Sequence, residues 1–507
     1  MVGKAAAEQA GAPAEVDVVV VGGGGTGLAA AIEARALGRD VVLLEKNPEL
    51  GGSTAWSIGS ITASNTRHQH REGIQDSPLE HFEDMPKFAP EVAHLDNEEL
   101  RWLLCQEMPD TFQWLLDKGI RFHGPVPEPP HRKPRMHTVL PNSKAYIYHL
   151  ERYARRHGVD VRKNLRANTL IVESGRVIGV ACAGPAGTQR FLGRGGIVLT
   201  AGDFTNSPEL KAEYISAQAA KVEGVNPTAT GDGQVMAIEL GGRIVNGDQA
   251  LGPEIRFIAP EGEGLVGRLP PWGPLAALME WSMGNLPQWL LRPFVLSFLT
   301  TALAPTPALF DEGAVLVNKL GKRFCDELDG PALALPDQPD KVGYIVVDEQ
   351  IAQKFSAWPH FISTAPSVAY AHMADYRRNR PDVYNTGASW AQLAAKLDVE
   401  PGVLEAAIAE HNTALGEQRP KLENPPFYAL GPVRSVFVHN EGGLVVDSEH
   451  RVLDQGDQPI PGLFAAGATG QGGLLLKGHG HHLAWAFTSG RRAGRRAAFE
   501  VTTADLE

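Results

Sequence analysis

The sequence has few cysteines, and their spacing does not pair them. Cys105, Cys182 and Cys325 are the only three among 507 residues, and no two of them form a CxxC motif. Neither a disulfide framework nor a cysteine-ligated zinc or iron–sulfur site is therefore indicated. A reducing cytoplasm is the expected compartment.

A basic block and a long uninterrupted apolar run are also missing. The net charge is -12, which argues against nucleic acid as a partner. Residues 1–16 lack the apolar core of a secretory signal, so we predict a flexible tail. The longest uncharged run within 269–310 extends from Pro293 to Phe310 and is broken by Pro305 and Pro307, so we do not expect a transmembrane helix.

The segment 269–310 is nevertheless rich in Trp, Leu, Phe and Pro. We interpret it as an inserted helical pair that packs its own core. Two alternatives stay open: an apolar entrance for the substrate, and a peripheral contact with a membrane surface. The large aromatic residues that bear on this choice are Trp272, Trp281, Trp289, Phe294 and Phe298.

The sequence does contain a strand–turn–helix–strand pattern over residues 17–46, DVVVVGGGGTGLAAAIEARALGRDVVLLEK. Gly22 allows a tight turn, Gly24 lets the backbone approach a pyrophosphate, and Gly27 lets the helix pack against the sheet. Glu45 ends the second strand, 18 residues after Gly27. A carboxylate there can accept hydrogen bonds from ribose hydroxyls, so the pattern predicts a dinucleotide-binding site.

Two later segments match other edges of such a sheet. Residues 159–204 are predicted to form consecutive strands, with a turn at Ser174–Gly175 and a final apolar strand that enters a small-residue turn. Residues 460–470, IPGLFAAGATG, predict an apolar strand closed by Gly467, and a last helix is expected from about His482 to Phe499. Pieces of one nucleotide-binding domain therefore come from both ends of the chain.

We predict an α/β fold with an insertion of different amino-acid composition between these pieces. The flexible tail covers residues 1–16, and the binding domain combines 17–245 with 423–507. The insertion, 246–422, combines an apolar Pro-rich part with strand-like and helical stretches and is expected to form an α+β capping domain.

The motifs also occur in a familiar order. After the glycine fingerprint come GGSTAWSIGSITA, VLTAGDFTNSPEL, TGDGQVMAIELGG, VLVNKLGKRFCDE, PPFYAL, EGGLVVD and IPGLFAAG. Together they resemble the FAD-dependent family of fumarate reductases, succinate dehydrogenase flavoproteins and 3-ketosteroid dehydrogenases, over nearly the whole chain. The resemblance implies a Rossmann-like, glutathione-reductase-like FAD-binding domain with an inserted cap. It also implies an enzyme that adds or removes hydrogen across a carbon–carbon bond next to a carbonyl or carboxylate.

The resemblance assigns FAD contacts to individual positions and shows two departures. Asp203 stands where a second glycine is usual, and Ala468 stands where the family usually places Glu or Asn. Ser53 occupies the neighbourhood in which covalently flavinylated members place a histidine, so non-covalent FAD is expected. The expected cofactor-binding residues are Gly22, Gly24, Gly25, Thr26, Gly27, Glu45, Lys46, Gly52, Ser53, Thr54, Ser57, Gly59, Ala167, Ala201, Gly202, Asp232, Gly467 and Leu483.

Three residues are expected to be catalytic by the same resemblance. Counting back from the family's G-R-x-A-G motif at 490–494, Lys477 falls where fumarate reductases carry a substrate-binding arginine, and His479 lies in the same loop. His439, before the GGL turn, matches a histidine that binds the substrate's carbonyl or carboxylate. Lys477 either acts as a base or binds a substrate oxygen. The loop histidines have no Cys or acid near them in sequence, so we predict no metal site.

The cap departs from the fumarate-reducing members. After GKRFCDE the sequence continues LDGPALALPDQPDK, without the arginine that serves those members as proton donor. Dicarboxylates are best held by several arginines. We therefore expect α,β-dehydrogenation of a hydrophobic cyclic ketone, of a 3-ketosteroid-like or cyclohexanone-like kind. Two alternatives stay open: a fumarate-reductase-like ene reductase acting on an unsaturated carboxylate, and a flavoprotein subunit of an electron-transfer complex.

No second nucleotide fingerprint for NAD(P)H occurs in the sequence. The expected electron acceptor is therefore external: a quinone, an electron-transfer protein or oxygen. We expect a small-molecule substrate and a cytoplasmic location, with membrane association as the alternative.

Overall fold

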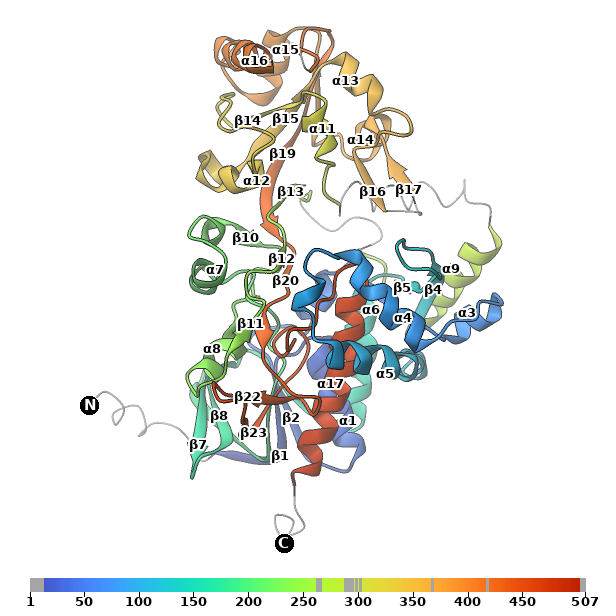
Figure 1. The fold of residues 1–507 in the computed structure, drawn as a ribbon, viewed down its shortest axis with the longest axis vertical. Helices are drawn as coiled ribbons and strands as arrows, with labels where there is room; N and C mark the ends of the chain where they lie inside the picture. The colour runs from blue at the N-terminus through green and yellow to red at the C-terminus, as the bar shows by residue number, and fades with distance from the viewer. Residues whose placement is uncertain are drawn as a thin grey trace, which may run out of the picture.

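The computed structural model describes residues 13–501 apart from 261–266, 287–295, 297–299, 301–302, 366–368 and 416–418. An eight-stranded sheet forms its lower half, with the order β22-β23-β9-β1-β2-β6 and with β7 and β8 attached beside β9 (Figure 1). The strands from β23 to β6 are parallel. Their bounds are β1 (Ala14–Val21), β2 (Val41–Leu44), β6 (Asp160–Arg162), β7 (Arg166–Glu173), β8 (Arg176–Gly184), β9 (Gly187–Leu199), β22 (Arg451–Leu453) and β23 (Pro459–Ala465).

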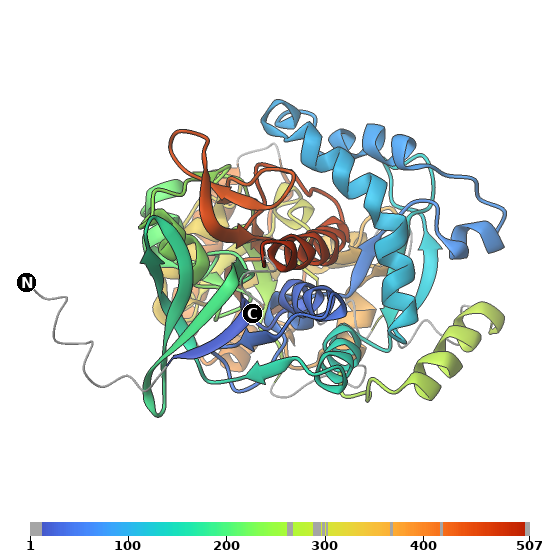
Figure 2. The same cartoon turned by 90° about the horizontal axis from the view of Figure 1, so that it is seen from below.

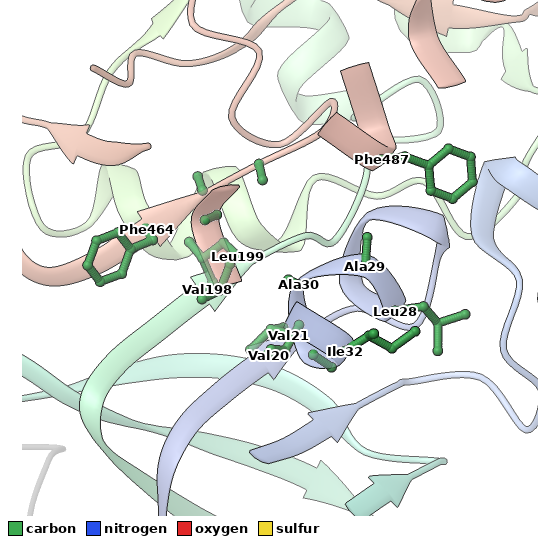
Figure 3. Packing of buried hydrophobic residues seen from close by; sticks show 14 of the residues in the cluster. Val20, Val21, Leu28, Ala29, Ala30, Ile32, Val198, Leu199, Phe464 and Phe487 are labelled. Atoms are coloured by element: carbon green, nitrogen blue, oxygen red, sulfur yellow. The ribbon is translucent and has the colours of Figure 1, made fainter. Parts of the chain in front are cut away.

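Buried apolar runs explain the parallel strands. Val18 to Val21 of β1 are all at most 5% exposed, because helices and loops cover both faces of the sheet. Figure 3 shows Val20 and Val21 near Val198 and Leu199 of β9, with Leu28 to Ala30 and Ile32 of the first helix beside Val20 and Val21. The turn predicted at Ser174–Gly175 is confirmed, and both residues have positive φ.

Two long helices pack side by side beside this sheet, as Figures 1 and 2 both show. They are α1 (Gly25–Ala36) and α17 (His481–Phe499). A Cβ added at Gly490 would lie 2.4 Å from the carbonyl oxygen of Thr26, and one at Gly494 would lie 2.1 Å from that of Ala30. The two glycines of α17 therefore allow backbone contact with α1.

The cap is built on a second sheet of six strands. Its longest strand, β19, runs from the cap toward the lower half of the molecule, where the chain continues into β20 and β21 (Figure 1). The cap has a hydrophobic core of its own, made of residues between 255 and 433, whereas the core of the larger sheet uses residues between 18 and 237 and between 444 and 498. The strands are β10 (Glu223–Gly224), β13 (Glu254–Phe257), β14 (Val315–Asn318), β15 (Gly343–Val347), β18 (Tyr384–Gly387) and β19 (Phe427–Phe437).

Helices and short strands complete both halves. The three-stranded sheet is β3 (Ser60–Thr62), β5 (Met136–Leu140) and β4 (Arg121–Val126), and the two-stranded sheets are β11 (Ile244–Val245) with β21 (Gly443–Leu444), β12 (Ala250–Leu251) with β20 (His439–Asn440), and β16 (Ser363–Ala365) with β17 (Ala369–Ala371). The helices of the lower half are α2 (Gly52–Trp56), α3 (Arg67–Arg71), α4 (Pro78–Asp84), α5 (Glu98–Asp117), α6 (Lys144–Arg156), α7 (Pro208–Tyr214) and α8 (Asp232–Ile238). The insertion adds α9 (Gly273–Asn285), α11 (Ala308–Asp311), α12 (Pro331–Ala334), α13 (Glu349–Lys354), α14 (Met373–Asn379), α15 (Trp390–Leu397) and α16 (Pro401–Leu415).

The predicted α/β class is confirmed, and the exact domain bounds stay a prediction. The expectation that 269–310 packs its own core is wrong for α9, in which only Ala276 is buried. Trp272 and Trp281 are 59% and 57% exposed. The apolar residues of α9 occur on all sides of the helix, but only one side packs against β4 and β5. Trp289, Phe294 and Phe298 lie outside the described residues. Among the described residues, no helix is long and apolar enough to cross a membrane.

Replacing Gly27 by alanine tests the packing of α1. The added Cβ would lie 1.9 Å from the Gly22 carbonyl oxygen, so we expect a loss of about 1–3 kcal/mol in the free energy of unfolding, together with weaker FAD binding. Gly402→Ala is the control, because nothing lies within 4 Å of a Cβ there. Thermal unfolding and the flavin-to-protein absorbance ratio measure both effects. Equal behaviour of the two variants would contradict this account.

Candidate active site

The turn between β1 and α1 is shaped by close backbone contacts. Gly22 has φ +110°, and a Cβ at this position would lie 2.4 Å from the Thr200 carbonyl oxygen at the end of β9. The start of α1 has no side-chain cap and no acidic residue in its first turn. An anion can therefore bind at this helix start, as the predicted pyrophosphate site requires.

A second loop lies across this helix start. Gly24 and Gly51 form a parallel bridge, and the Gly25 N–H donates to Thr54 Oγ1 at 3.2 Å. A Cβ added at Gly467, after β23, would lie 2.4 Å from Thr26 Oγ1. The sequence-predicted glycine turn, the loop after β2 and the turn after β23 therefore meet at one edge of the sheet, where ligands of open parallel sheets bind.

Glu45 is held at the end of β2 by two main-chain groups. Its Oε2 accepts from the Gly23 N–H at 2.7 Å, and its Oε1 accepts from the Asn47 N–H at 2.8 Å. The residue is 5% exposed. Each carboxylate oxygen keeps a second lone pair, so Glu45 can also accept from the hydroxyls of a ribose.

Other predicted cofactor residues are tied to one another. Lys46 Nζ lies 3.1 Å from Asp232 Oδ2, which links the loop after β2 to the start of α8. Ser57 Oγ accepts from the Gly59 N–H at 3.1 Å, and Ser53 Oγ accepts from Asn226 Nδ2 at 2.9 Å. The remaining positions follow or belong to regular elements: Ala201 and Gly202 follow β9, Ala167 is buried in β7, and Leu483 is buried in the first turn of α17.

Asp203, the departure from the usual glycine, has a structural use. Its Oδ1 accepts from the Thr205 N–H and hydroxyl, and its Oδ2 accepts from the Asn440 N–H at 3.3 Å. Burial raises the pKa of the Asp203 carboxyl, against the lowering effect of these hydrogen bonds. The side chain thus fastens β20, which carries His439, to the turn after β9.

Two of the three predicted catalytic residues meet at a buried carboxylate, Glu441. Its Oε1 lies 3.6 Å from His439 Nε2 and 3.7 Å from Lys477 Nζ. A third group, His482 Nε2, lies 3.4 Å from the same oxygen. We call Glu441, His439, Lys477 and His482 the Glu441 cluster. The Glu441 carboxylate is fully buried, whereas the other three side chains are each about one quarter exposed.

The other carboxylate oxygen of Glu441 is fixed by the loop before α17. Gln471 Nε2 donates to Oε2 at 2.5 Å, and the Leu476 N–H donates to it at 3.0 Å. Burial alone would raise the pKa of the Glu441 carboxyl, but the facing rings of His482 and His439 lower it well below its usual value. Burial lowers the pKa of His439, and nearby His482 lowers it further against the effect of Glu441.

The third predicted catalytic residue, His479, lies outside the Glu441 cluster. Its ring Nδ1–H and its main-chain N–H both donate to Glu128 Oε1, at 2.5 and 2.9 Å. This hydrogen bond raises the pKa of His479, although burial opposes it. Its catalytic role remains a prediction, and the structure gives it a partner that the sequence did not suggest.

A buried histidine trio lies behind the same loop. His481 Nδ1–H donates to the Lys477 carbonyl oxygen at 2.6 Å, and its Nε2 lies 3.2 Å from His81 Nε2. His131 Nδ1 lies 2.9 Å from an Arg135 guanidinium nitrogen. These rings could offer nitrogen ligands to a metal, as could His439 and His482 with Glu441. A guanidinium or an ammonium adjoins each set, which disfavours a divalent cation there.

Sequence reasoning missed Glu441 and His482 as members of the site. Glu441 stands two residues after His439, and residues two apart in an extended chain face the same side. That spacing was the available signal. His482 was a candidate loop or proton-relay histidine beside Lys477, together with His479 and His481, but the sequence did not single it out because its approach to Glu441 depends on how the loop before α17 folds.

The cap supplies no substitute for the missing arginine in the described part of that region. Arg323 of GKRF is paired with Glu327 at 2.7 Å, and this carboxylate also accepts from the Leu316 N–H. Tyr376 of α14 is buried with its hydroxyl 2.8 Å from Ser363 Oγ. Both groups belong to the cap's own structure.

Comparison with known proteins agrees with the fold and the glycine turn. A family model described as an FAD binding domain matches residues 17–251 and 291–475. These features define an FAD-dependent oxidoreductase. The chain belongs to this FAD-binding family; its resemblance to fumarate reductases is confirmed, and it shares the fold of 3-ketosteroid dehydrogenases.

Three curated relatives cover most of the chain. A probable fumarate reductase of Shewanella frigidimarina is 26% identical over 96% of this chain and 76% of its own length. A urocanate reductase of Eggerthella lenta is 26% identical over 90% of this chain and 70% of its own. A vinyl phenol reductase of Lactiplantibacillus plantarum is 25% identical, with 95% and 96% covered.

Two solved structures share the fold. The open conformation of a flavocytochrome c3 fumarate reductase matches with a TM-score of 0.70 and 24% identity, over 96% of this chain and 79% of that one. A 3-ketosteroid delta1-dehydrogenase from Sterolibacterium denitrificans matches with a TM-score of 0.63 and 19% identity, over 96% and 99%.

The attachment of FAD can be tested directly. Ser53 carries a hydroxyl that accepts from Asn226, and a serine hydroxyl does not offer the nucleophilic ring nitrogen of a histidine. We expect acid precipitation of the purified yellow protein to release all of its flavin into the supernatant. Yellow colour that stays with the washed pellet would show covalent attachment.

Proposed function

We propose that the protein reduces a carbon–carbon double bond next to a carbonyl group, with the Glu441 cluster as its substrate-binding face. The observation that carries this proposal is the meeting of Lys477, His439 and His482 at one buried carboxylate, where the chain after β20 meets the loop and the first turn of α17. Each of the three presents a partly exposed side chain that can reach a ligand. FAD, when bound, supplies the hydride for one of the two carbons.

The chain's own residues then have two tasks. Lys477 and His439 donate hydrogen bonds to the carbonyl oxygen, on which negative charge develops as the hydride arrives. His482 delivers a proton to the adjacent carbon, since it lies beside His439 with the ring centroids 3.8 Å apart. Glu441 holds all three groups, and His81 and His481 position the Lys477 main chain from behind.

The direction of the reaction is argued from the relatives. All three are named as reductases, which favours reduction over the ketone dehydrogenation that sequence analysis put first. Dehydrogenation of a cyclic ketone is the second candidate, and the absence of the cap arginine is the observation that keeps it. In the reduction, electrons come from an external partner of the quinone or electron-transfer-protein class; in the dehydrogenation they come from the ketone and leave the flavin for such a partner.

A peripheral membrane contact through 269–310 is part of the same proposal. Trp272, at the N-cap of α9, and Leu278 and Trp281 within it are each more than half exposed, and the Arg121–Glu280 ion pair holds this helix to β4. Such amphipathic ring systems favour the boundary of a lipid layer. A quinone dissolved in the membrane would reach the protein at this surface.

Anaerobic mixing tests the reaction and its direction. Dithionite-reduced holoenzyme is mixed with an enone, with fumarate and with urocanate, and the recovery of oxidised flavin absorbance is followed. We expect re-oxidation by at least one of these compounds. If none re-oxidises the flavin, while a saturated ketone bleaches the oxidised holoenzyme, the second candidate replaces the first.

Removing the Lys477 side chain tests its role. Lys477→Ala takes away one donor to the developing negative charge, so we expect turnover to fall about 100-fold or more, with flavin content unchanged. Lys319→Ala is the matched control, since its side chain is 54% exposed on the cap and pairs only with Asp340 among the described residues. Full turnover of Lys477→Ala would remove this residue from the mechanism.

A further inference from the structure

Glu441 places a permanent negative charge inside the proposed substrate site. It is the member of the Glu441 cluster with no exposure, and hydrogen bonds from Gln471 and Leu476 prevent its Oε2 from turning away. Oε1 is left facing His439, His482 and Lys477. Neither the carboxylate nor its orientation is free to adapt when a ligand enters.

We propose that Glu441 determines substrate charge: it cancels the charge of Lys477, so that the site takes a neutral conjugated ketone or aldehyde and rejects a carboxylate. This inference rests on the proposed function and narrows it to one substrate class. Glu441 acts through its neighbours and is a specificity residue; it does not contact the reacting carbons.

The charge balance supports this choice. Lys477 contributes one positive charge and Glu441 one negative charge, 3.7 Å apart, and His482 adds no charge in its neutral form. Because burial lowers the pKa of His439, that ring is neutral in the folded protein near pH 7 and acts as a hydrogen-bond donor without full charge. A neutral carbonyl oxygen needs such donors and no net charge.

Two further carboxylates, those of Asp96 and Asp203, lie near the Glu441 cluster and do not offset the negative charge of Glu441. Asp96 accepts from the Leu475 N–H at 2.7 Å in the same loop, and its other oxygen pairs with Arg101 at 2.7 Å. Asp203 accepts from Asn440, beside His439. A substrate carboxylate would therefore approach a site that already carries a fixed anion. At an effective dielectric constant of about 20, two charges about 5 Å apart change binding on the order of a hundredfold, so Glu441 offsets an attraction of this size that Lys477 alone would exert on a substrate carboxylate.

A pair of ligands that differ only in charge tests the inference. Benzalacetone carries a methyl ketone where trans-cinnamate carries a carboxylate, and both have the same conjugated skeleton. Their dissociation constants are measured from the change in flavin absorbance of oxidised holoenzyme. We expect wild-type protein to bind benzalacetone at least about tenfold more tightly than cinnamate. Glu441→Gln keeps the shape of the side chain and should shift this ratio toward cinnamate by about tenfold or more.

Glu128→Gln is the control variant. It also removes a buried carboxylate near the loop, but one that pairs with His479 outside the Glu441 cluster, so the ratio should stay within about twofold. Equal binding of the two ligands by wild-type protein, binding of neither, or an unchanged ratio in Glu441→Gln would overturn the inference. The comparison of the two dissociation constants in wild-type protein tests the inference even if Glu441→Gln does not fold.

Binding and turnover separate this inference from the proposed function. If benzalacetone binds selectively but does not re-oxidise reduced flavin, the inference that Glu441 determines substrate charge stands and the reductase proposal fails. If cinnamate re-oxidises the flavin as fast as benzalacetone does, the reductase proposal stands and the inference about substrate charge fails.

Discussion

The close contact between α1 and α17 is the constraint on which the rest of the structure depends. Gly490 and Gly494 let α17 approach the backbone of α1 at Thr26 and Ala30, where any side chain would collide. The first turn of α1 forms the predicted pyrophosphate site, and the loop before α17 carries Lys477. One helix pair therefore fixes the distance between the cofactor turn and the proposed catalytic loop, although 451 residues separate Thr26 from Lys477 in sequence.

A buried carboxylate then organises that loop. Glu441 receives hydrogen bonds from Gln471 and the Leu476 N–H, and Lys477 and the two histidines gather at its second oxygen. A buried carboxylate without such partners would be strongly destabilising, so the loop and the β20–β21 turn are coupled energetically. The same charge that holds the loop also limits which substrates can bind, so stability and specificity share one residue.

Local patterns allowed the cofactor half to be predicted, because each glycine and Glu45 acts within a short strand–turn–helix unit. The catalytic half was predicted less completely. His439 and Lys477 were found by their place in family motifs, but the approach of His482 to Glu441 and the pairing of His479 with Glu128 depend on tertiary contacts between distant segments. The exposure of α9 was missed because its apolar residues are spread over all sides of the helix and do not mark one buried face.

A crystal structure of the holoenzyme with an unreactive saturated ketone tests the central claim most directly, since it locates cofactor and ligand together. The account predicts the FAD pyrophosphate at the N-terminus of α1, and the ketone oxygen within hydrogen-bonding distance of Lys477 or His439, with Glu441 still buried behind them. A ketone bound with its oxygen away from the Glu441 cluster, or a flavin ring that does not face that cluster, would contradict it.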